Sequence, residues 1–253
     1  MNYDLQGKTA IVTGSCAGLG AAIVEKLVDE GVNVVISGTK KHEDTDERLK
    51  TYNERVKAVF IPCDVSKQED IDNLFDETLR QFHAVDIIIN NAGVWMTSYI
   101  KDMGLSDFRK TLEINLLGPF MLSKRFVNYC LDNKRKGKIV NMTSQAAFHG
   151  STSGHAHYAS SKAGLVGFTI SLAREVAPYG INVNAVAPGI METRMVSAIV
   201  DDPERRKQYL ERIPLRRIAT TEEIARVVLF LVSSQADYIT GATLDATGGM
   251  LMR

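Results

Sequence analysis

Seven short runs of apolar, largely β-branched residues recur along the chain, each separated from the next by a segment long enough for a helix. The runs span residues 9–13, 33–37, 57–61, 86–89, 138–142, 181–186 and 243–245. Nearly continuous apolar character predicts strands that are buried on both faces, as in a parallel sheet between two layers of helices. Right-handed crossovers then favour a doubly wound α/β fold with a mainly parallel, seven-stranded sheet.

The whole chain of 253 residues is expected to form a single domain. It has no linker, repeat or low-complexity stretch, and its 45% hydrophobic content is sufficient for one large core. Ser66 is expected to open one helix, and Pro178 with Gly180 to end the helix that begins near Tyr158. A further helix is predicted over 107–131. The irregular segment around 190–212 is a candidate substrate loop or lid.

Several classes of partner are not expected. Thirty basic and thirty acidic residues give a formal charge of zero, so no global field favours nucleic acid or a membrane surface. No stretch has the roughly 20 apolar residues that a membrane helix needs, and the N-terminus has no apolar signal core. Three widely spaced cysteines fit reduced thiols and a cytoplasmic location. No cluster of residues indicates a metal site.

A glycine-rich turn, Thr13-Gly-Ser-Cys-Ala-Gly-Leu-Gly20, follows the first run directly and opens a helix. Glycines let backbone N–H groups approach a pyrophosphate, and a helix N-terminus adds partial positive charge. A structural bend is the alternative. The position at a strand–helix junction favours a dinucleotide site in a Rossmann-type fold. The predicted cofactor-binding residues here are Gly14, Ser15, Cys16, Ala17, Gly18, Leu19 and Gly20.

The second run ends in Ser37-Gly-Thr-Lys-Lys41, which contains no acidic residue to hold a ribose 2′-hydroxyl. Thr39 and Lys40 could instead bind a 2′-phosphate, so NADP(H) is favoured and NAD(H) stays possible. The alternative is that Lys40 and Lys41 only begin a solvated helix.

Two further turns are candidates for contact with the cofactor. Asp64, beside Val65, could accept a hydrogen bond from an adenine amino group, or it could cap the helix near Ser66. The turn 90–93, Asn-Asn-Ala-Gly, ends the fourth run, where Asn91, Ala92 and Gly93 would lie near the nicotinamide-side ribose. An ordinary Asn-Gly turn is the alternative.

Tyr158 and Lys162 stand four residues apart in Tyr-Ala-Ser-Ser-Lys, fourteen residues after Ser144. On a helix, such a pair shares one face. The lysine charge should favour tyrosinate and lower a tyrosine pKa that is otherwise about 10. A surface pair without function is the alternative, because the four-residue pattern alone is common.

Together these residues resemble the short-chain dehydrogenase/reductase family over nearly the whole chain, through 13–20, 90–93, Asn115, Ser144, 158–162 and 188–193. The resemblance implies that Tyr158 is the acid or base at a carbonyl and that Ser144 polarises its oxygen. It also implies that Lys162 lowers the tyrosine pKa and grips the ribose, while Asn115 anchors a water for proton resupply. Further cofactor contacts are implied at Pro188, Gly189, Ile190 and Thr193.

Within the family, the framework is most similar to that of 3-oxoacyl-[acyl-carrier-protein] reductases. Of the two basic positions with which those reductases engage the carrier protein, the chain keeps Arg135 but has Tyr179 at the other, so carrier docking is uncertain. Sugar, polyol and hydroxysteroid dehydrogenases share the framework and are alternatives. A remoter alternative is a non-catalytic dinucleotide sensor, although a sensor needs no proton relay.

The small-molecule substrate, a carbonyl or alcohol, would meet side chains near the catalytic tyrosine. Candidate lining residues with roles that the sequence leaves open are Trp95, Met96, Tyr99, His149, His155 and His157. The resemblance also implies a homotetramer, in which the helices that contain Asp107 and Tyr158 pack across a two-fold axis and the C-terminus joins another interface.

Overall fold

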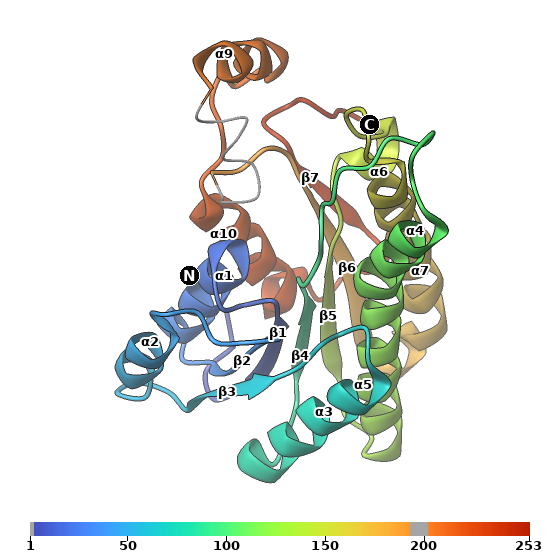
Figure 1. Ribbon diagram of the computed structural model, residues 1–253. Coiled ribbons are helices and arrows are strands. Elements are labelled where there is room, and N and C mark those ends of the chain that lie inside the picture. Colours follow the sequence, from blue (N-terminus) through green and yellow to red (C-terminus); the bar gives the residue numbers. More distant parts are fainter. Residues whose placement is uncertain (1–2, 193–201) are drawn as a thin grey trace.

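Seven parallel strands form one central sheet in the computed structural model, which describes residues 3–192 and 202–253 (Figure 1). Their order is β3-β2-β1-β4-β5-β6-β7, and every neighbouring pair is parallel. The strands are β1 (Thr9–Thr13), β2 (Asn33–Gly38), β3 (Ala58–Pro62), β4 (Ile87–Asn90), β5 (Gly137–Met142), β6 (Ile181–Pro188) and β7 (Thr243–Ala246). All seven predicted strands are therefore confirmed, with bounds that differ by no more than two residues.

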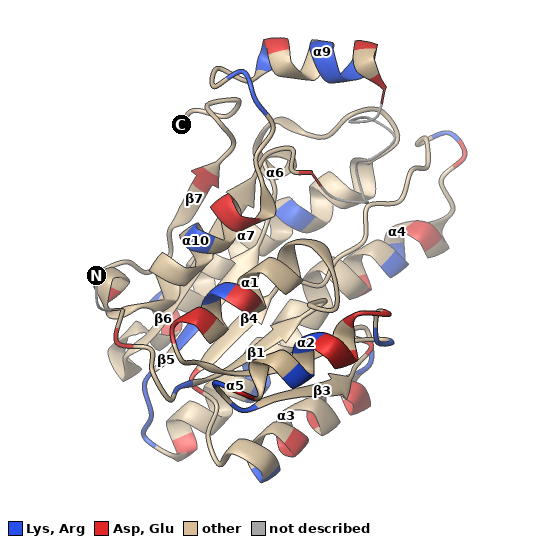
Figure 2. Ribbon diagram, turned by 90° about the vertical axis from the view of Figure 1, so that its left-hand side faces the viewer, with Lys and Arg blue, Asp and Glu red and all other residues tan. Residues whose placement is uncertain are grey.

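Helices cover both faces of this sheet (Figure 1). They are α1 (Gly18–Asp29), α2 (Thr45–Tyr52), α3 (Gln68–Phe82), α4 (Leu105–Leu112), α5 (Gly118–Asp132), α6 (Ala146–His149), α7 (Ala156–Val176), α9 (Pro203–Arg212) and α10 (Thr221–Val232). Helices α1 and α10 pack on one face, and α3, α5 and α7 pack on the other. Charged side chains lie mainly on the helices and loops, and few lie on the strands (Figure 2).

Two hydrophobic cores result from the alternation of side chains along the strands. Ala10 and Val12 of β1 belong to the core under α1 and α10, whereas Ile11 belongs to the core under α3 and α5. Successive side chains of a strand point to opposite faces, so a strand that is covered on both sides must be apolar throughout. This requirement explains the unbroken apolar runs of the sequence.

The strand order reverses between β1 and β4, which are neighbours in the sheet although β2 and β3 separate them in the chain. Chain segments that leave these two strands diverge to opposite sides, and a crevice opens outside their carboxyl ends. Helices α6 and α9 lie at this same end of the molecule (Figure 1). The fold thereby brings the loops that follow β1, β4, β5 and β6 to one place.

Helix boundaries differ from the prediction in two places. The expected helix over 107–131 is divided into α4, a π-helical segment η1 (Glu113–Leu117) and α5. Helix α3 begins after Lys67 rather than Ser66, because the Asp64 carboxylate accepts hydrogen bonds from the backbone and the hydroxyl of Ser66 in a separate turn. Helix α7 ends as predicted, with a short 3₁₀ turn η2 (Ala177–Tyr179) before Gly180.

A second 3₁₀ turn, η4 (Ser234–Ala236), follows α10. Across residues 3–192 and 202–253, no helix has the length and apolar character that crossing a membrane requires.

Candidate active site

A cavity of about 1140 Å³ occupies the crevice at the carboxyl ends of the strands. It is lined by nearly all the predicted cofactor residues and by three of the four predicted catalytic residues: Gly14, Cys16, Ala17, Gly18, Leu19, Gly20, Thr39, Lys40, Asp64, Val65, Asn91, Ala92, Gly93, Ser144, Tyr158, Lys162, Pro188, Gly189 and Ile190. Ser15 and Asn115 are fully buried beside it and do not line it. Thr193 lies outside the described residues.

The glycine-rich turn is shaped for an anion. Gly14 and Gly18 have φ angles of +62° and +57°, which residues other than glycine rarely adopt. A Cβ atom at Gly20 would lie 2.4 Å from the Gly14 carbonyl oxygen, so this glycine is required by close packing. Helix α1 has no side-chain cap at Ala17 and no acidic residue in its first turn. Its free N–H groups and dipole therefore fit a dinucleotide pyrophosphate.

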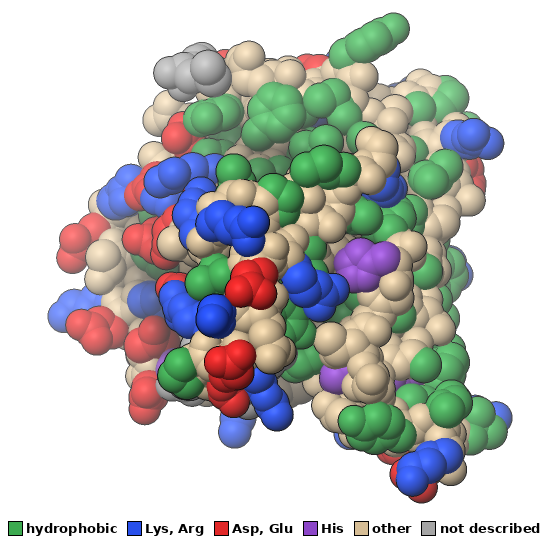
Figure 3. Space-filling model, turned by 90° about the horizontal axis from the view of Figure 1, so that it is seen from above, with side chains coloured by type: hydrophobic (Ala, Val, Ile, Leu, Met, Phe, Trp, Pro, Cys, Tyr) green, Lys and Arg blue, Asp and Glu red, His purple; other side chains and the backbone are tan. Residues whose placement is uncertain are grey.

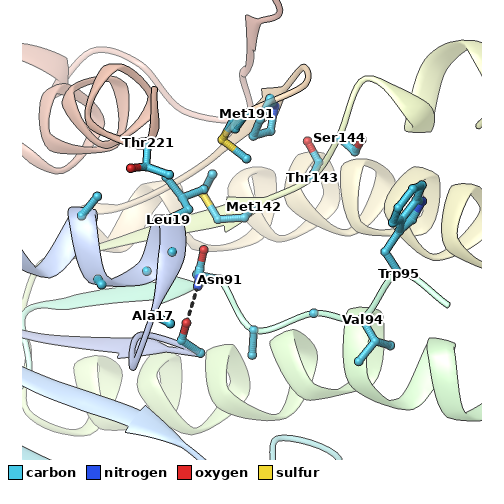
Figure 4. A pocket seen from close by; sticks show the side chains of 18 of the residues that line it. Ala17, Leu19, Asn91, Val94, Trp95, Met142, Thr143, Ser144, Met191 and Thr221 are labelled. Atoms are coloured by element: carbon cyan, nitrogen blue, oxygen red, sulfur yellow. Dashed lines mark hydrogen bonds between the residues drawn. The ribbon is translucent and has the colours of Figure 1, made fainter. Parts of the chain in front are cut away.

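The residues under this turn hold it in place. The Ser15 hydroxyl donates to the Val12 carbonyl at 2.6 Å and accepts from the Ser37 N–H at 3.0 Å. The Asn91 amide donates to the carbonyls of Thr13 and Gly14 at 3.0 and 2.9 Å (Figure 4). Ser15 was predicted to bind the cofactor, but its side chain faces the protein interior and supports the turn.

The end of the cavity formed by β2 and α2 is lined by both basic and acidic side chains. Lys40 and Arg48 line this end together with Thr39, and Asp44 is the one nearby acid among the lining residues of the segment 38–52. Arg48 donates a hydrogen bond to the Cys16 carbonyl and pairs with the Asp44 carboxylate at 3.3 Å. Arg48 escaped the sequence analysis because it belongs to a helix 32 residues beyond Cys16.

Ser144, Tyr158 and Lys162 converge in the cavity from two elements. Ser144 follows β5, while Tyr158 and Lys162 lie one turn apart on α7. The Lys162 ammonium donates to the Met142 carbonyl at 2.7 Å and lies 5.9 Å from the centre of the Tyr158 ring. Ser144 lies close enough to Tyr158 to lower the tyrosine pKa. The spacing in the sequence therefore corresponds to a group in three dimensions.

The electrostatics of this group differ from the expectation. Burial raises the pKa of Tyr158, and Ser144 only partly opposes that effect. Burial also lowers the pKa of Lys162 to about 8, because the cavity wall removes water from the ammonium. The predicted lowering of the tyrosine pKa by Lys162 is therefore wrong, because desolvation by burial dominates and the opposing effect comes from Ser144. A neutral tyrosine of this kind is suited to donate a proton.

Asn115 occupies the π-helical segment η1 and connects it to the loop after β4. Its side chain accepts from the Val94 N–H at 2.8 Å, and it donates to the Val94 carbonyl at 3.0 Å and to the Ser161 hydroxyl at 3.1 Å. A Cβ atom at Gly93 would lie 3.2 Å from the Asn115 Oδ1 atom and 3.5 Å from the Lys162 Nζ atom. Asn115 thus fixes the segment next to Lys162, and its side-chain groups are occupied by protein partners.

Side chains around Ser144 and Tyr158 form the second end of the cavity. Trp95 lies across the pocket from Leu19 and Thr221 (Figure 4). His155 does not line the cavity; it stacks on Trp95, with ring centres 4.3 Å apart, and so holds the indole from behind. Met191, Tyr209 and Arg212 also line the cavity and belong to the segment 190–212 that was predicted as a substrate loop or lid, whereas the lining residues Gln145 and Met250 were missed by sequence reasoning.

The remaining histidines have separate surroundings. His149 lines the cavity, whereas His157 is buried near Asp107, and burial lowers the pKa of His157. Met96 and Tyr99 are not lining residues. No group of three or more potential metal ligands occurs in the described parts of the chain. The end of the molecule where the cavity lies exposes apolar side chains, acidic and basic side chains, and histidines (Figure 3).

Comparisons with known proteins agree with this geometry. A family model described as Enoyl-(Acyl carrier protein) reductase matches residues 14–251. A 3-oxoacyl-[acyl-carrier-protein] reductase of Aquifex aeolicus is 40% identical over 99% of this chain and 100% of its own length. 3beta-hydroxysteroid dehydrogenase 1 of Eggerthella lenta is 38% identical over 100% of this chain and 97% of its own.

Solved structures lead to the same result. A short-chain dehydrogenase/reductase of the glucose/ribitol dehydrogenase type from Brucella melitensis has a TM-score of 0.90 and 32% identity, with 100% of both chains covered. The chain belongs to the short-chain dehydrogenase/reductase family. It is therefore an oxidoreductase that acts on CH–OH and C=O groups and uses a nicotinamide dinucleotide. In a short-chain dehydrogenase/reductase, one cavity must bind both the dinucleotide and the substrate.

Proposed function

We propose that the enzyme reduces a ketone to a secondary alcohol, or catalyses the reverse oxidation, with Tyr158 as the acid or base. The observation that carries the proposal is the convergence of Ser144, Tyr158 and Lys162 in one cavity. Ser144 would hold the carbonyl oxygen, and the Tyr158 hydroxyl would protonate that oxygen as it becomes an alkoxide.

The nicotinamide cofactor supplies the hydride when it is bound. The glycine-rich turn and the uncapped α1 N-terminus would hold its pyrophosphate, and Asn91, Ala92 and Gly93 would approach the nicotinamide-side ribose. Lys162 would grip the hydroxyls of that ribose. Pro188, Gly189, Ile190 and Thr193 would bind the nicotinamide, and Asn115 would serve proton resupply.

NADP(H) is the proposed cofactor. Lys40 and Arg48 line the adenosine end of the cavity, and Thr39 is exposed there, so a 2′-phosphate would meet two cations. Asp44 lies close to these groups, but its carboxylate is already paired with Arg48 and with His42. Binding of NAD(H) would leave the two cations without a phosphate partner.

The proposal leaves out docking of an acyl carrier protein. Arg135, the one basic position shared with the carrier-dependent reductases, is partly exposed and paired with Asp86 at 2.8 Å, and Tyr179 is exposed. A carrier phosphate or acidic helix would have to compete with this ion pair. We infer that a free small molecule is the substrate.

Assembly and location complete the proposal. A homotetramer is supported by exposed apolar side chains on α4, η1, α5 and α7. A cytosolic location is supported by three free cysteines. The segment 190–212 would act as the substrate lid, and its helix α9 contributes Tyr209 and Arg212 to the cavity wall.

Replacement of Tyr158 by phenylalanine tests the catalytic function. The enzyme would first be screened with oxoacyl thioesters, ketoses, polyols and ketosteroids and with both cofactors. On the best substrate, Tyr158→Phe should lower kcat at least 100-fold while the affinity for NADPH changes little, because only the proton donor is lost. Tyr179→Phe is the control, since this tyrosine lies on the surface, 58% exposed. Unchanged turnover in Tyr158→Phe would refute the mechanism.

A further inference from the structure

Gln145 stands immediately after Ser144, where β5 has ended and α6 is about to begin. Its backbone N–H donates to the carbonyl of Pro188 at 3.1 Å, so the residue is tied to the end of the neighbouring strand β6. Its side chain lines the cavity. The position of Gln145 beside the reacting carbonyl is therefore set by two strands and not by a free loop.

The side-chain oxygen of Gln145 has no hydrogen-bond partner, although it is shielded from solvent. An unpaired buried amide oxygen costs roughly 1–3 kcal/mol, and such groups in native proteins usually have a reason. Most of the other unpaired side-chain atoms of the described residues lie away from Ser144. They belong to Ser37, Arg48, Arg135, His157 and Thr243. A group that binds beside Ser144 would satisfy Gln145.

Charge in the cavity is distributed unequally. Its acidic side chains, Glu25, Asp44, Asp64 and Glu222, come from α1, α10 and the segments around α2 and β3, at the dinucleotide end. Among the described residues, the wall around Ser144 is lined by hydrogen-bonding groups and an indole rather than by acids, from Trp95, Gln145, His149, Ser151 and Thr152. Such a wall matches a neutral, hydroxyl-bearing ligand better than a bare hydrocarbon.

We propose that Gln145 is a specificity residue that accepts a hydrogen bond from a hydroxyl group on the carbon next to the reacting carbonyl. The inference rests on the proposed function, because it takes Ser144 as the residue that holds the carbonyl oxygen. Because Gln145 directly follows Ser144, its side chain can reach a substrate group close to the carbonyl that Ser144 holds. The substrate class is therefore that of α-hydroxy ketones and vicinal diols, as in sugars and polyols.

The other candidate substrates lack this donor. A ring ketone of a steroid is flanked by carbon alone, and a 3-oxoacyl thioester is flanked by a methylene group and then by a carbonyl, which only accepts hydrogen bonds. If either were bound, the Gln145 oxygen would stay buried and unpaired. A site that is built to bind a hydroxyl group discriminates strongly against an analogue without it, for this reason.

A matched pair of ketones tests the proposal. Reduction of 2-hydroxycyclohexanone to cyclohexane-1,2-diol and of cyclohexanone to cyclohexanol would be followed with NADPH, each reaction consuming one hydride and one proton. Wild-type kcat/KM should favour the hydroxy ketone at least tenfold. Gln145→Leu should reduce this ratio to near one, through a loss on the hydroxy ketone only, because leucine has similar size but no acceptor.

Gln145→Glu is the second variant, since a carboxylate keeps the acceptor and loses the amide donor. It should retain the preference for the hydroxy ketone; loss of the preference would mean that the amide donates to a substrate carbonyl instead, and would overturn the proposal. An unchanged ratio in Gln145→Leu would overturn it as well. So would a parallel loss on both ketones with weaker NADPH binding, which would assign Gln145 to the cofactor.

Failure of the proposed function would look different. An enzyme that turned over a ketosteroid or an oxoacyl thioester but neither cyclohexane ketone would retain the proposed function and contradict only the hydroxyl contact. An enzyme that reduced no carbonyl compound of the screen would contradict the function itself.

Discussion

Lys40 and Lys41 are neighbours in the chain and have different surroundings. Lys40 lines the adenosine end of the cavity, whereas Lys41 forms an ion pair with Asp46 on the surface. We expect Lys40→Ala to raise the Kd for NADPH about tenfold, because a lost charged contact to phosphate is worth about 1.5–3 kcal/mol. The Kd for NADH should change less than twofold.

Fluorescence titrations with both cofactors would measure these constants. Lys41→Ala is the matched control, and its two Kd values should stay at the wild-type level. If Lys40→Ala weakened the binding of NADPH and of NADH equally, this result would contradict a contact between Lys40 and the 2′-phosphate.

The buried charge of Lys162 affects the free energy of unfolding. Burial lowers its pKa from 10.5 in the unfolded chain to about 8 in the fold. Below pH 8 both states bind the proton, and the buried charge costs the fold about 3 kcal/mol, at about 1.4 kcal/mol per unit. As the pH rises from 8 to 10.5, the folded state has lost this proton while the unfolded state still binds it, so the stability of the fold increases.

We therefore expect Lys162→Met to be more stable than the wild type at pH 7. Loss of the hydrogen bond to the Met142 carbonyl should offset about 1 kcal/mol of the gain. Urea unfolding of both proteins should show the advantage of the variant falling by about 3 kcal/mol as the pH is raised from 7 to 10.5. The exposed Lys124→Met is the control, and a pH-independent difference for Lys162→Met would contradict the buried charge.

At the scale of elements, the π-helical segment η1 shows what periodicity cannot predict. Apolar spacing predicted one helix over 107–131, and the chain there is helical. The helix changes its pitch at Glu113–Leu117, where Asn115 forms hydrogen bonds with Val94 and Ser161. These partners lie 21 and 46 residues away in the chain. Single π turns often occur at functional sites, and here the turn carries the asparagine that holds the loop after β4.

The asparagine in this turn should contribute more to stability than an ordinary helix asparagine. We expect Asn115→Ala to lower the free energy of unfolding by on the order of 3 kcal/mol, because it leaves the Val94 N–H and carbonyl unpaired in a buried place. Asn133→Ala, at the end of α5, should cost less than about 1 kcal/mol, since its side chain is exposed and donates only to the Tyr129 carbonyl.

Urea unfolding at neutral pH would compare the two variants. A loss of less than 1 kcal/mol in Asn115→Ala would show that η1 does not depend on this side chain.

At the scale of the molecule, the predictable parts of the site were those encoded by consecutive residues at strand ends. The glycine-rich turn and the segment 90–93 are local, and the order of parallel strands brings them together. Arg48 reaches the cavity from a helix whose placement depends on the whole fold, so no local pattern marked it. The tyrosine pKa was predicted with the wrong sign for the same reason, because desolvation is a property of the complete cavity wall.

Helices α4, α5 and α7 lie together at one side of the molecule (Figure 1). With η1, they expose an unusual number of apolar side chains for a surface. Leu105 is 64% exposed, Leu117 47%, Phe120 43% and Ile170 39%, and Phe120 meets Phe168 edge to face at 6.1 Å. Contact between two copies of the chain along these helices would remove this surface from water. It would also bury the back of α7, the helix that carries Tyr158 and Lys162.

Sedimentation of the wild type should therefore give four times the 27.9 kDa chain mass. Phe120→Glu should reduce it to a dimer or monomer at micromolar concentration, because a carboxylate without a partner is costly to bury in an interface. Thr51→Glu adds the same charge on exposed α2 and should leave the mass unchanged. A wild-type monomer, or a tetramer that persists in Phe120→Glu, would show that these helices are not the interface. If dissociation also lowers turnover without affecting NADPH binding, the partner copy supports the catalytic helix and not the cofactor site.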